Sequence, residues 1–116
     1  MFDYFKIEEF ACSCCGKNKI DPQFVKKLDD ARRLAKIPFI ITSGYRCEKH
    51  NKEVGGKPNS SHLSGLAADI SCQTSTSRYL IVNALIRAGF NRIGIAKDFI
   101  HCDIDKDKPQ EVIWIY

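Results

Sequence analysis

The order of its expected secondary structure most constrains how this 116-residue chain can fold. Apolar residues recur at helical spacing after an Asp21 cap and Pro22, and Pro38 ends that helix. A second amphipathic helix is expected from a Ser75–Thr76 cap to Gly89. The remaining apolar segments are short and do not alternate regularly with helices. This order predicts an α+β domain with a largely antiparallel sheet.

Five short segments rich in apolar and β-branched residues are the predicted strands. They are Phe39–Thr42, which we expect to be buried, Leu66–Ser71, Arg92–Ala96, Phe99–Ile104 and Glu111–Tyr116. A short polar helix is expected from Cys47 to Val54, where Gly55 and Gly56 would end it. At this length we expect one domain, 1–116, with a cysteine-containing segment (1–19) packed on it.

Composition excludes several classes of protein. Charged residues make up 28% of the chain, with seven glycines and four prolines, which excludes disordered and collagen-like chains. No apolar run approaches the ~18–20 residues of a membrane span, and the N-terminus lacks the pattern of a secretory signal. The net charge of +4 is spread along the chain, unlike a nucleic-acid footprint. We therefore expect synthesis in the cytoplasm without a signal peptide, no membrane insertion and no nucleic-acid partner.

The six cysteines admit several interpretations. They are Cys12, Cys14, Cys15, Cys47, Cys72 and Cys102. An even number could form three disulfides, whereas a cytosol would keep the thiols reduced. Metal binding by the first three is another option, but Cys12 and Cys15 form only one Cys-x2-Cys knuckle, and a zinc-ribbon nucleic-acid binder would need two. Cys102 lies next to His101 and on a strand would point to the opposite face, which argues against a nucleophile–base pair.

Two segments place a histidine close to an aspartate. His62 and Asp69 are seven positions apart, so they could share a zinc ion only if the backbone turned between them, and Gly65 allows such a turn. On a strand, His101 and Asp103 would share one face. Spacing alone leaves structural roles open for these residues. His62 could be a core or capping histidine, and His101 and Asp103 could face solvent on an edge strand.

Five stretches of the chain together resemble the D-alanyl-D-alanine carboxypeptidase family of zinc peptidases, in particular the small single-domain type common in phages and prophages. The stretches are Ile41–Cys47, His50-Asn51, Val54–Gly56, Ser60–Ile70 and Phe99–Asp103. The resemblance extends from Phe10 to Tyr116. It implies a Hedgehog/DD-peptidase-like fold, with a central antiparallel sheet and helices packed on one side.

The resemblance also implies a metal site. His62, Asp69 and His101 match the family's three zinc ligands, and three protein ligands leave a fourth position open for water. Asp98, three residues before His101, matches the family's general base. Asp98 is expected in a turn between two strands, and Asp103 is the alternative base, although its expected role is to fix a ligand or a neighbouring strand.

Further residues match the family's substrate-binding positions or lie near them. Arg46 corresponds to the arginine that holds a substrate carboxylate or stabilises the oxyanion. Ser60 is implied to donate a hydrogen bond to the substrate backbone. Tyr45 and Trp114 are expected to pack in the core rather than to line a cleft. His50 is not expected to bind the zinc ion, despite its helical spacing from Cys47, but to be structural or to support the ligands through hydrogen bonds.

The resemblance implies a zinc metallopeptidase that cuts peptidoglycan stem peptides, at the terminal D-Ala-D-Ala bond or at an internal L-Ala-D-Glu bond. We expect a monomer that acts on the cell wall, in host lysis or from a virion. The alternative is a non-catalytic, zinc-containing wall-binding or phage structural module of the same fold. The cluster of Cys12, Cys14 and Cys15 could tie its segment to the body through Cys47, by a disulfide or by a second, structural metal.

Overall fold

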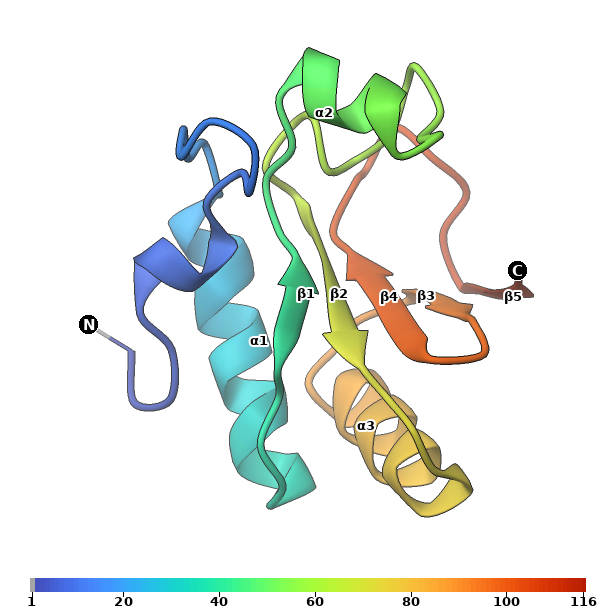
Figure 1. The fold of residues 1–116 in the computed structure, drawn as a ribbon. Coiled ribbons are helices and arrows are strands. Elements are labelled where there is room, and N and C mark those ends of the chain that lie inside the picture. The colour runs from blue at the N-terminus through green and yellow to red at the C-terminus, as the bar shows by residue number, and fades with distance from the viewer. Residues whose placement is uncertain (1) are drawn as a thin grey trace.

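A five-stranded sheet forms the centre of the computed structural model, which describes residues 2–116 (Figure 1). Its strands lie in the order β1-β2-β4-β3-β5. In chain order, they are β1 (Ile41–Ser43), β2 (Ala67–Ser71), β3 (Arg92–Ile95), β4 (Phe99–Asp103) and β5 (Val112–Ile115). All five lie within the segments predicted from the sequence, apart from the last residue of β1. The α+β class expected from the sequence is therefore confirmed.

Three α-helices and a short 3-10 helix accompany the sheet. They are the 3-10 helix η1 (Ile7–Phe10), α1 (Pro22–Ala35), α2 (Glu48–Glu53) and α3 (Ser75–Arg87). The expected Asp21 cap is confirmed, because its side chain accepts from Gln23 N at 2.8 Å. The cap of α3 is Thr74, one residue earlier than expected. None of the helices in the described part of the chain is long and apolar enough to cross a membrane.

Strand pairing departs from a fully antiparallel sheet at one place. The pairs β1–β2, β2–β4 and β3–β4 are antiparallel, but β3 and β5 are parallel. The connection from β4 to β5 is long enough to carry the chain back past β3, and β5 then runs in the same direction as β3. The sheet is therefore mixed, and the expectation of a central antiparallel sheet holds for three of its four pairs.

The predicted strand at Phe39–Thr42 exists, but the prediction that it is buried is wrong. The strand there is β1, which lies at one edge of the sheet, and its residues are at most half-buried. The side chain of Ile40, just before it, is 64% exposed. An apolar run alone does not distinguish a central strand from an edge strand, because neither its length nor its composition depends on its neighbours.

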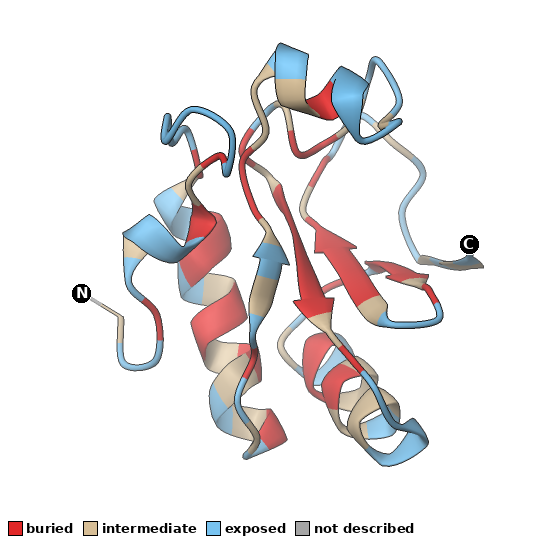
Figure 2. Ribbon diagram, in the orientation of Figure 1, coloured by how far each residue is buried: buried red, intermediate tan, exposed pale blue. Residues whose placement is uncertain are grey.

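The two faces of the sheet differ in character. Ala68 and Ile70 on β2, and Ile100 and Cys102 on β4, are fully buried in the apolar core. The same core contains buried residues of α1 and α3, which lie next to each other (Figures 1 and 2). Strand side chains alternate between faces, so the intervening residues of β2 and β4 point to the face away from these helices.

The N-terminal segment packs on the body of the protein. Phe5 and Phe10 are buried in the same core, and the ring of Phe10 lies 6.4 Å from that of Phe24 on α1. Two of the six cysteines, Cys72 and Cys102, are also buried there. These two behave as small apolar residues.

Gly65 joins the turn before β2 to the segment that enters α1. It has a φ of +72°, and a Cβ built on it would lie 1.9 Å from the carbonyl oxygen of Lys19. Its own carbonyl oxygen accepts from Asp21 N at 2.8 Å. Only glycine satisfies both the positive φ and the close approach of the two backbones.

Replacing this glycine is expected to destabilise the fold. Gly65→Ala adds backbone strain and a steric clash, so we expect the free energy of unfolding to fall by about 3 kcal/mol. Gly55 is the matched control, because it has a φ of +76° but no atom within 4 Å of a built Cβ. Gly55→Ala should cost only about 1 kcal/mol, from strain alone. Urea unfolding monitored by circular dichroism measures both, and equal losses would contradict the packing role of Gly65.

Candidate metal centre

A row of side chains crosses the sheet on the face opposite the helices. The strand register pairs Asp69 of β2 with His101 of β4, then His101 with Gly94 of β3, and Gly94 with Trp114 of β5. Because paired residues of neighbouring strands point to the same face, these residues are held side by side by the sheet. Long-range backbone pairing therefore brings Asp69 to His101, which is 32 positions away in sequence.

His62 joins this row from the turn that precedes β2. Backbone hydrogen bonds from Leu63 N to Ser60 O (3.1 Å) and from Gly65 N to His62 O (3.3 Å) close the turn. The His62 Nε2 atom lies 3.3 Å from Asp69 Oδ1. The predicted backbone turn between His62 and Asp69 is confirmed.

Three possible ligand atoms converge in this buried place. His101 Nδ1 lies 3.0 Å from the same oxygen, Asp69 Oδ1, and one donor atom from each of His62, Asp69 and His101 lies within 4.8 Å of the others. Each of the three residues is at most 6% exposed. Zinc bonds of ~2.0–2.2 Å place neighbouring ligand atoms a little over 3 Å apart. The three residues therefore fit the requirements of a metal ion in both chemistry and spacing.

Hydrogen bonds on the far side of each imidazole fix which nitrogen faces the centre. His62 Nδ1 donates to the carbonyl oxygen of Gly44 at 2.7 Å, which leaves the Nε2 lone pair directed at the site. His101 Nε2 donates to Asp103 Oδ2 at 2.8 Å, which leaves Nδ1 facing Asp69. Such partners orient metal-binding histidines and select the tautomer that can coordinate.

Asp103 is fully committed to this supporting role. Its Oδ2 atom accepts from His101, while Oδ1 accepts from Arg92 Nε at 2.7 Å and from Asp105 N at 3.1 Å. It is only 1% exposed. The structure thus places Asp103 where the sequence expected a residue that fixes a ligand.

The ionisable groups of the centre favour bound positive charge. Burial alone would raise the pKa of Asp69, but hydrogen bonds with His101 and His62 hold this pKa well below its usual range. Burial alone would lower the pKa of His101, yet its hydrogen bonds to Asp103 and Asp69 raise it. The pKa of Asp103 is lowered by His101 and Arg92 against the opposing effect of burial. Two buried carboxylates therefore stay ionised around the imidazoles.

Arg46 contacts the centre from the segment between β1 and α2. Its guanidinium donates to Ser43 Oγ at 2.9 Å, to Asn51 Oδ1 at 3.2 Å and to Asp69 Oδ2 at 3.3 Å. An arginine side chain has five N–H donors, so two are left for another partner. Arg46 therefore both holds the Asp69 carboxylate and keeps donors available beside it.

Asp98 is not brought into contact with the three convergent residues, and Ser60 contacts one of them only through the backbone N–H of His62. The Ser60 hydroxyl accepts from His62 N at 3.2 Å, and Ser60 lines a cavity of about 320 Å³. Asp98 lies in the exposed turn between β3 and β4, which is the expected hairpin. Within residues 2–116, Asp98 forms hydrogen bonds through its backbone carbonyl oxygen, which accepts from Cys72 N at 3.0 Å and from Gln73 Nε2 at 3.4 Å.

The expectation of core packing is correct for Tyr45 and wrong for Trp114. Tyr45 is 7% exposed, whereas Trp114 is half-buried and its ring centroid lies 5.4 Å from that of His101. A Cβ on Gly94 would lie 2.6 Å from Trp114 Nε1, so this glycine lets the indole cross β3 towards the centre. A glycine inside a predicted strand was the available signal for this close approach.

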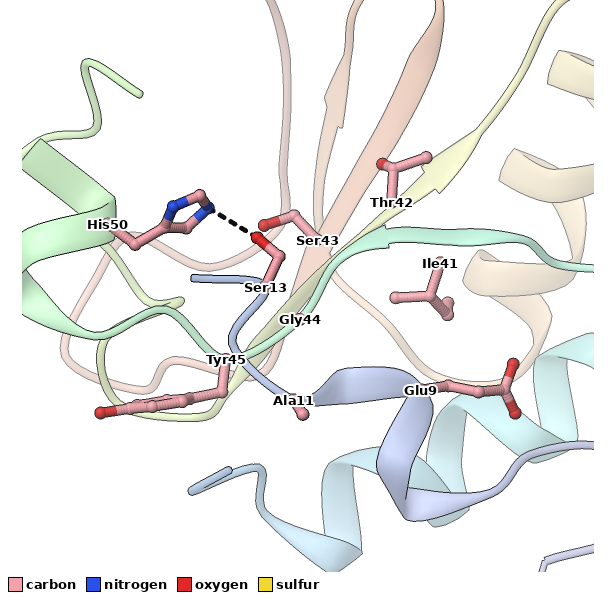
Figure 3. Close-up of a pocket in the computed structure, with 9 residues that line it drawn as sticks. All are labelled: Glu9, Ala11, Ser13, Ile41, Thr42, Ser43, Gly44, Tyr45 and His50. Atoms are coloured by element: carbon pink, nitrogen blue, oxygen red, sulfur yellow. Dashed lines mark hydrogen bonds between the residues drawn. The ribbon is translucent and has the colours of Figure 1, made fainter. Parts of the chain in front are cut away.

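A second cavity, of about 130 Å³, lies between the N-terminal segment, β1 and the start of α2 (Figure 3). His50 lies in its wall and its Nε2 atom is 3.2 Å from Ser13 Oγ. Ser43 lines the same cavity and accepts from Arg46. His50 is therefore separate from the metal centre, as expected, and the cavity adjoins the residues that hold Arg46.

Comparison with known proteins agrees with this geometry. The family model described as Peptidase M15 matches residues 3–103, a span that includes His62, Asp69 and His101. None of the curated proteins matches the chain significantly. The family match covers most of the chain and agrees with the resemblance to zinc D-alanyl-D-alanine carboxypeptidases noted from the sequence motifs. The chain therefore belongs to the peptidase M15 family.

Proposed function

We propose that this protein is a zinc metallopeptidase that hydrolyses peptide bonds in peptidoglycan stem peptides, at the D-Ala-D-Ala or the L-Ala-D-Glu link. The observation that carries the proposal is the buried convergence of His62, Asp69 and His101, with the tautomer of each imidazole set by a hydrogen bond. Membership of the M15 family supports it. Three protein ligands leave one coordination position for water, as a catalytic zinc site requires.

The chain's own residues suit such a reaction. A zinc ion held there would supply Lewis acidity, which activates water and polarises the scissile carbonyl. The two remaining donors of Arg46 could hold a carboxylate of the stem peptide or the oxyanion that forms during hydrolysis. Trp114 would form an apolar wall beside His101. Ser60 lies beside His62 at the edge of the larger cavity and is proposed to contact the substrate backbone.

Asp98 is the proposed general base. Its carboxylate would take a proton from the attacking water and pass it to the leaving amine. Support comes from the resemblance, in which the base lies three residues before the last ligand, and both oxygens of the alternative, Asp103, are already hydrogen-bonded in the buried core. Asp98 lies three residues from His101, ~10 Å along an extended strand, so its turn must bring the carboxylate towards the centre when substrate binds.

The exposed position of Asp98 also supports the alternative, a non-catalytic zinc-containing module that binds the wall or belongs to a phage particle. Such a module would keep the fold and the metal and would need no base. In either case we propose that the protein acts at the cell wall, as a monomer, in host lysis or from a virion.

Removing a proposed ligand should remove both metal and activity. We expect His62→Ala to lose the catalytic zinc ion and all cleavage of purified peptidoglycan, because two donors hold zinc poorly. His50→Ala is the matched control, since His50 lies outside the centre and contacts Ser13. Metal content by mass spectrometry and analysis of released peptides measure both effects. Unchanged metal content and lysis in His62→Ala would show that the site is assigned wrongly.

Replacing Asp98 and replacing Asp103 should have different effects on the protein. Asp98→Asn is expected to keep the zinc ion and to lower kcat by about 10²–10⁴-fold, as for loss of a general base. Asp103→Asn should instead weaken zinc binding by about 10–100-fold, because it disturbs the orientation of His101. Stem-peptide kinetics and zinc titration separate the two. Full activity of Asp98→Asn would exclude it as the base, and a holoprotein that cleaves no stem peptide would favour the non-catalytic module.

A further inference from the structure

Four cysteine side chains converge at a second place, outside the proposed catalytic centre. Cys12, Cys14 and Cys15 come from the N-terminal segment, and Cys47 is the cap of α2. The Sγ atoms of Cys12 and Cys14 are 3.6 Å apart, those of Cys12 and Cys47 3.7 Å, and those of Cys14 and Cys47 3.3 Å. Cys15 belongs to the same group, in which all four sulfur atoms lie within 4.8 Å of one another.

The spacing of the sulfur atoms matches a shared metal ion rather than disulfides. A disulfide requires two sulfur atoms ~2.05 Å apart, and all six cysteines of the chain are free thiols in the structure. Four thiolates on a tetrahedral zinc ion, with Zn–S bonds of ~2.3 Å, lie ~3.8 Å from one another. The three separations among Cys12, Cys14 and Cys47 are close to that value, and Cys15 lies within 4.8 Å of the other three sulfur atoms.

The backbone around the first three cysteines forms a tight knuckle. Cys12 N donates to Lys17 O at 2.7 Å, and Gly16 N donates to Cys12 O at 2.8 Å. Gly16 follows Cys15 and has a φ of +75°. This closed loop turns the side chains of Cys12, Cys14 and Cys15 towards one point, and a glycine is needed to reverse the chain.

Backbone donors support negative charge on the sulfur atoms. Cys47 N donates to Cys12 Sγ at 3.5 Å, and His50 N donates to Cys47 Sγ at 3.4 Å. A second possible group, of Cys14, His50 and Glu53, shares one thiol with the first. The Nε2 atom of His50 is hydrogen-bonded to Ser13, and the four thiols by themselves supply the four donors that a tetrahedral ion needs.

We propose that Cys12, Cys14, Cys15 and Cys47 bind a structural zinc ion. Four sulfur ligands fill a tetrahedral zinc site and leave no position for water, so this ion would not be catalytic. Tetrahedral sites made of sulfur ligands select zinc or iron. Because no coordination position would remain for water or substrate, the role of the ion would be structural.

The ion joins two segments that are 35 residues apart in the chain. Cys47 directly follows Arg46, whose guanidinium contacts Asp69. Next to it, Tyr45 N donates to Phe10 O at 2.8 Å, so the N-terminal segment already contacts this stretch of backbone. The zinc ion therefore holds the N-terminal segment against the stretch that positions Arg46. It does not depend on any catalytic activity of the other centre.

Metal content and cobalt spectroscopy of the full chain test this proposal. We expect two zinc ions per wild-type chain, and one each in His62→Ala and in Cys47→Ser. Cobalt-loaded wild type and His62→Ala should both show an intense thiolate-to-cobalt charge-transfer band, which Cys15→Ser and Cys47→Ser weaken or lose. Cys72→Ser is the matched control, because Cys72 is buried elsewhere and its thiol contacts Thr74 O.

The wild-type spectrum decides the question even if a cysteine variant does not fold. The proposal would be overturned if the cobalt-loaded wild type showed no charge-transfer band, or if the wild type bound iron in place of zinc. It would also be overturned if the metal-free, unfolded chain had fewer than six titratable thiols. A single zinc ion that disappears in His62→Ala would also overturn it, while leaving the catalytic centre intact. Conversely, one zinc ion that His62→Ala leaves in place, with the charge-transfer band present, would support the four-thiol site and contradict the proposed catalytic centre.

Discussion

The buried carboxylate of Asp69 is the group on which the arrangement of the site depends. One of its oxygens faces both His62 and His101, and the other accepts from Arg46. A buried negative charge is costly unless it is paired and hydrogen-bonded, so these partners must remain in place for the fold to tolerate it. Through this one side chain, the turn before β2, the central strand β4 and the segment before α2 are held together.

The two faces of the sheet have different roles: one packs the apolar core, and the other carries the candidate metal ligands. On one face, Ala68, Ile70 and Ile100 pack against α1 and α3 in an apolar core. On the other, Asp69 and His101 are neighbours in register. A rigid sheet sets the separation of such groups more precisely than a loop can, and only His62 needs a turn to reach them. The supporting hydrogen bonds then set the orientation of each ring.

The cysteine cluster adds a second connection to a small protein. A domain of this length buries a limited apolar core, and cross-links or structural metals commonly supplement such cores. Here the cluster and the candidate metal centre are linked by adjacent residues, because Arg46 contacts Asp69 and Cys47 belongs to the four thiols.

Local patterns in the sequence were sufficient to predict the helices, the Asp21 cap of α1, the strand segments and the alternation that separates His101 from Cys102, because these features depend on neighbouring residues. The cap of α3 was predicted one residue too late. The order and spacing of the motifs also identified the family and its three candidate ligands. Tertiary structure alone decided that β5 runs parallel to β3 and that Trp114 crosses Gly94 to reach His101. It also decided in favour of the contact between Cys47 and the N-terminal thiols, which the sequence had offered as one option. These contacts join residues far apart in the chain, and their pairing depends on how whole elements pack rather than on any local preference.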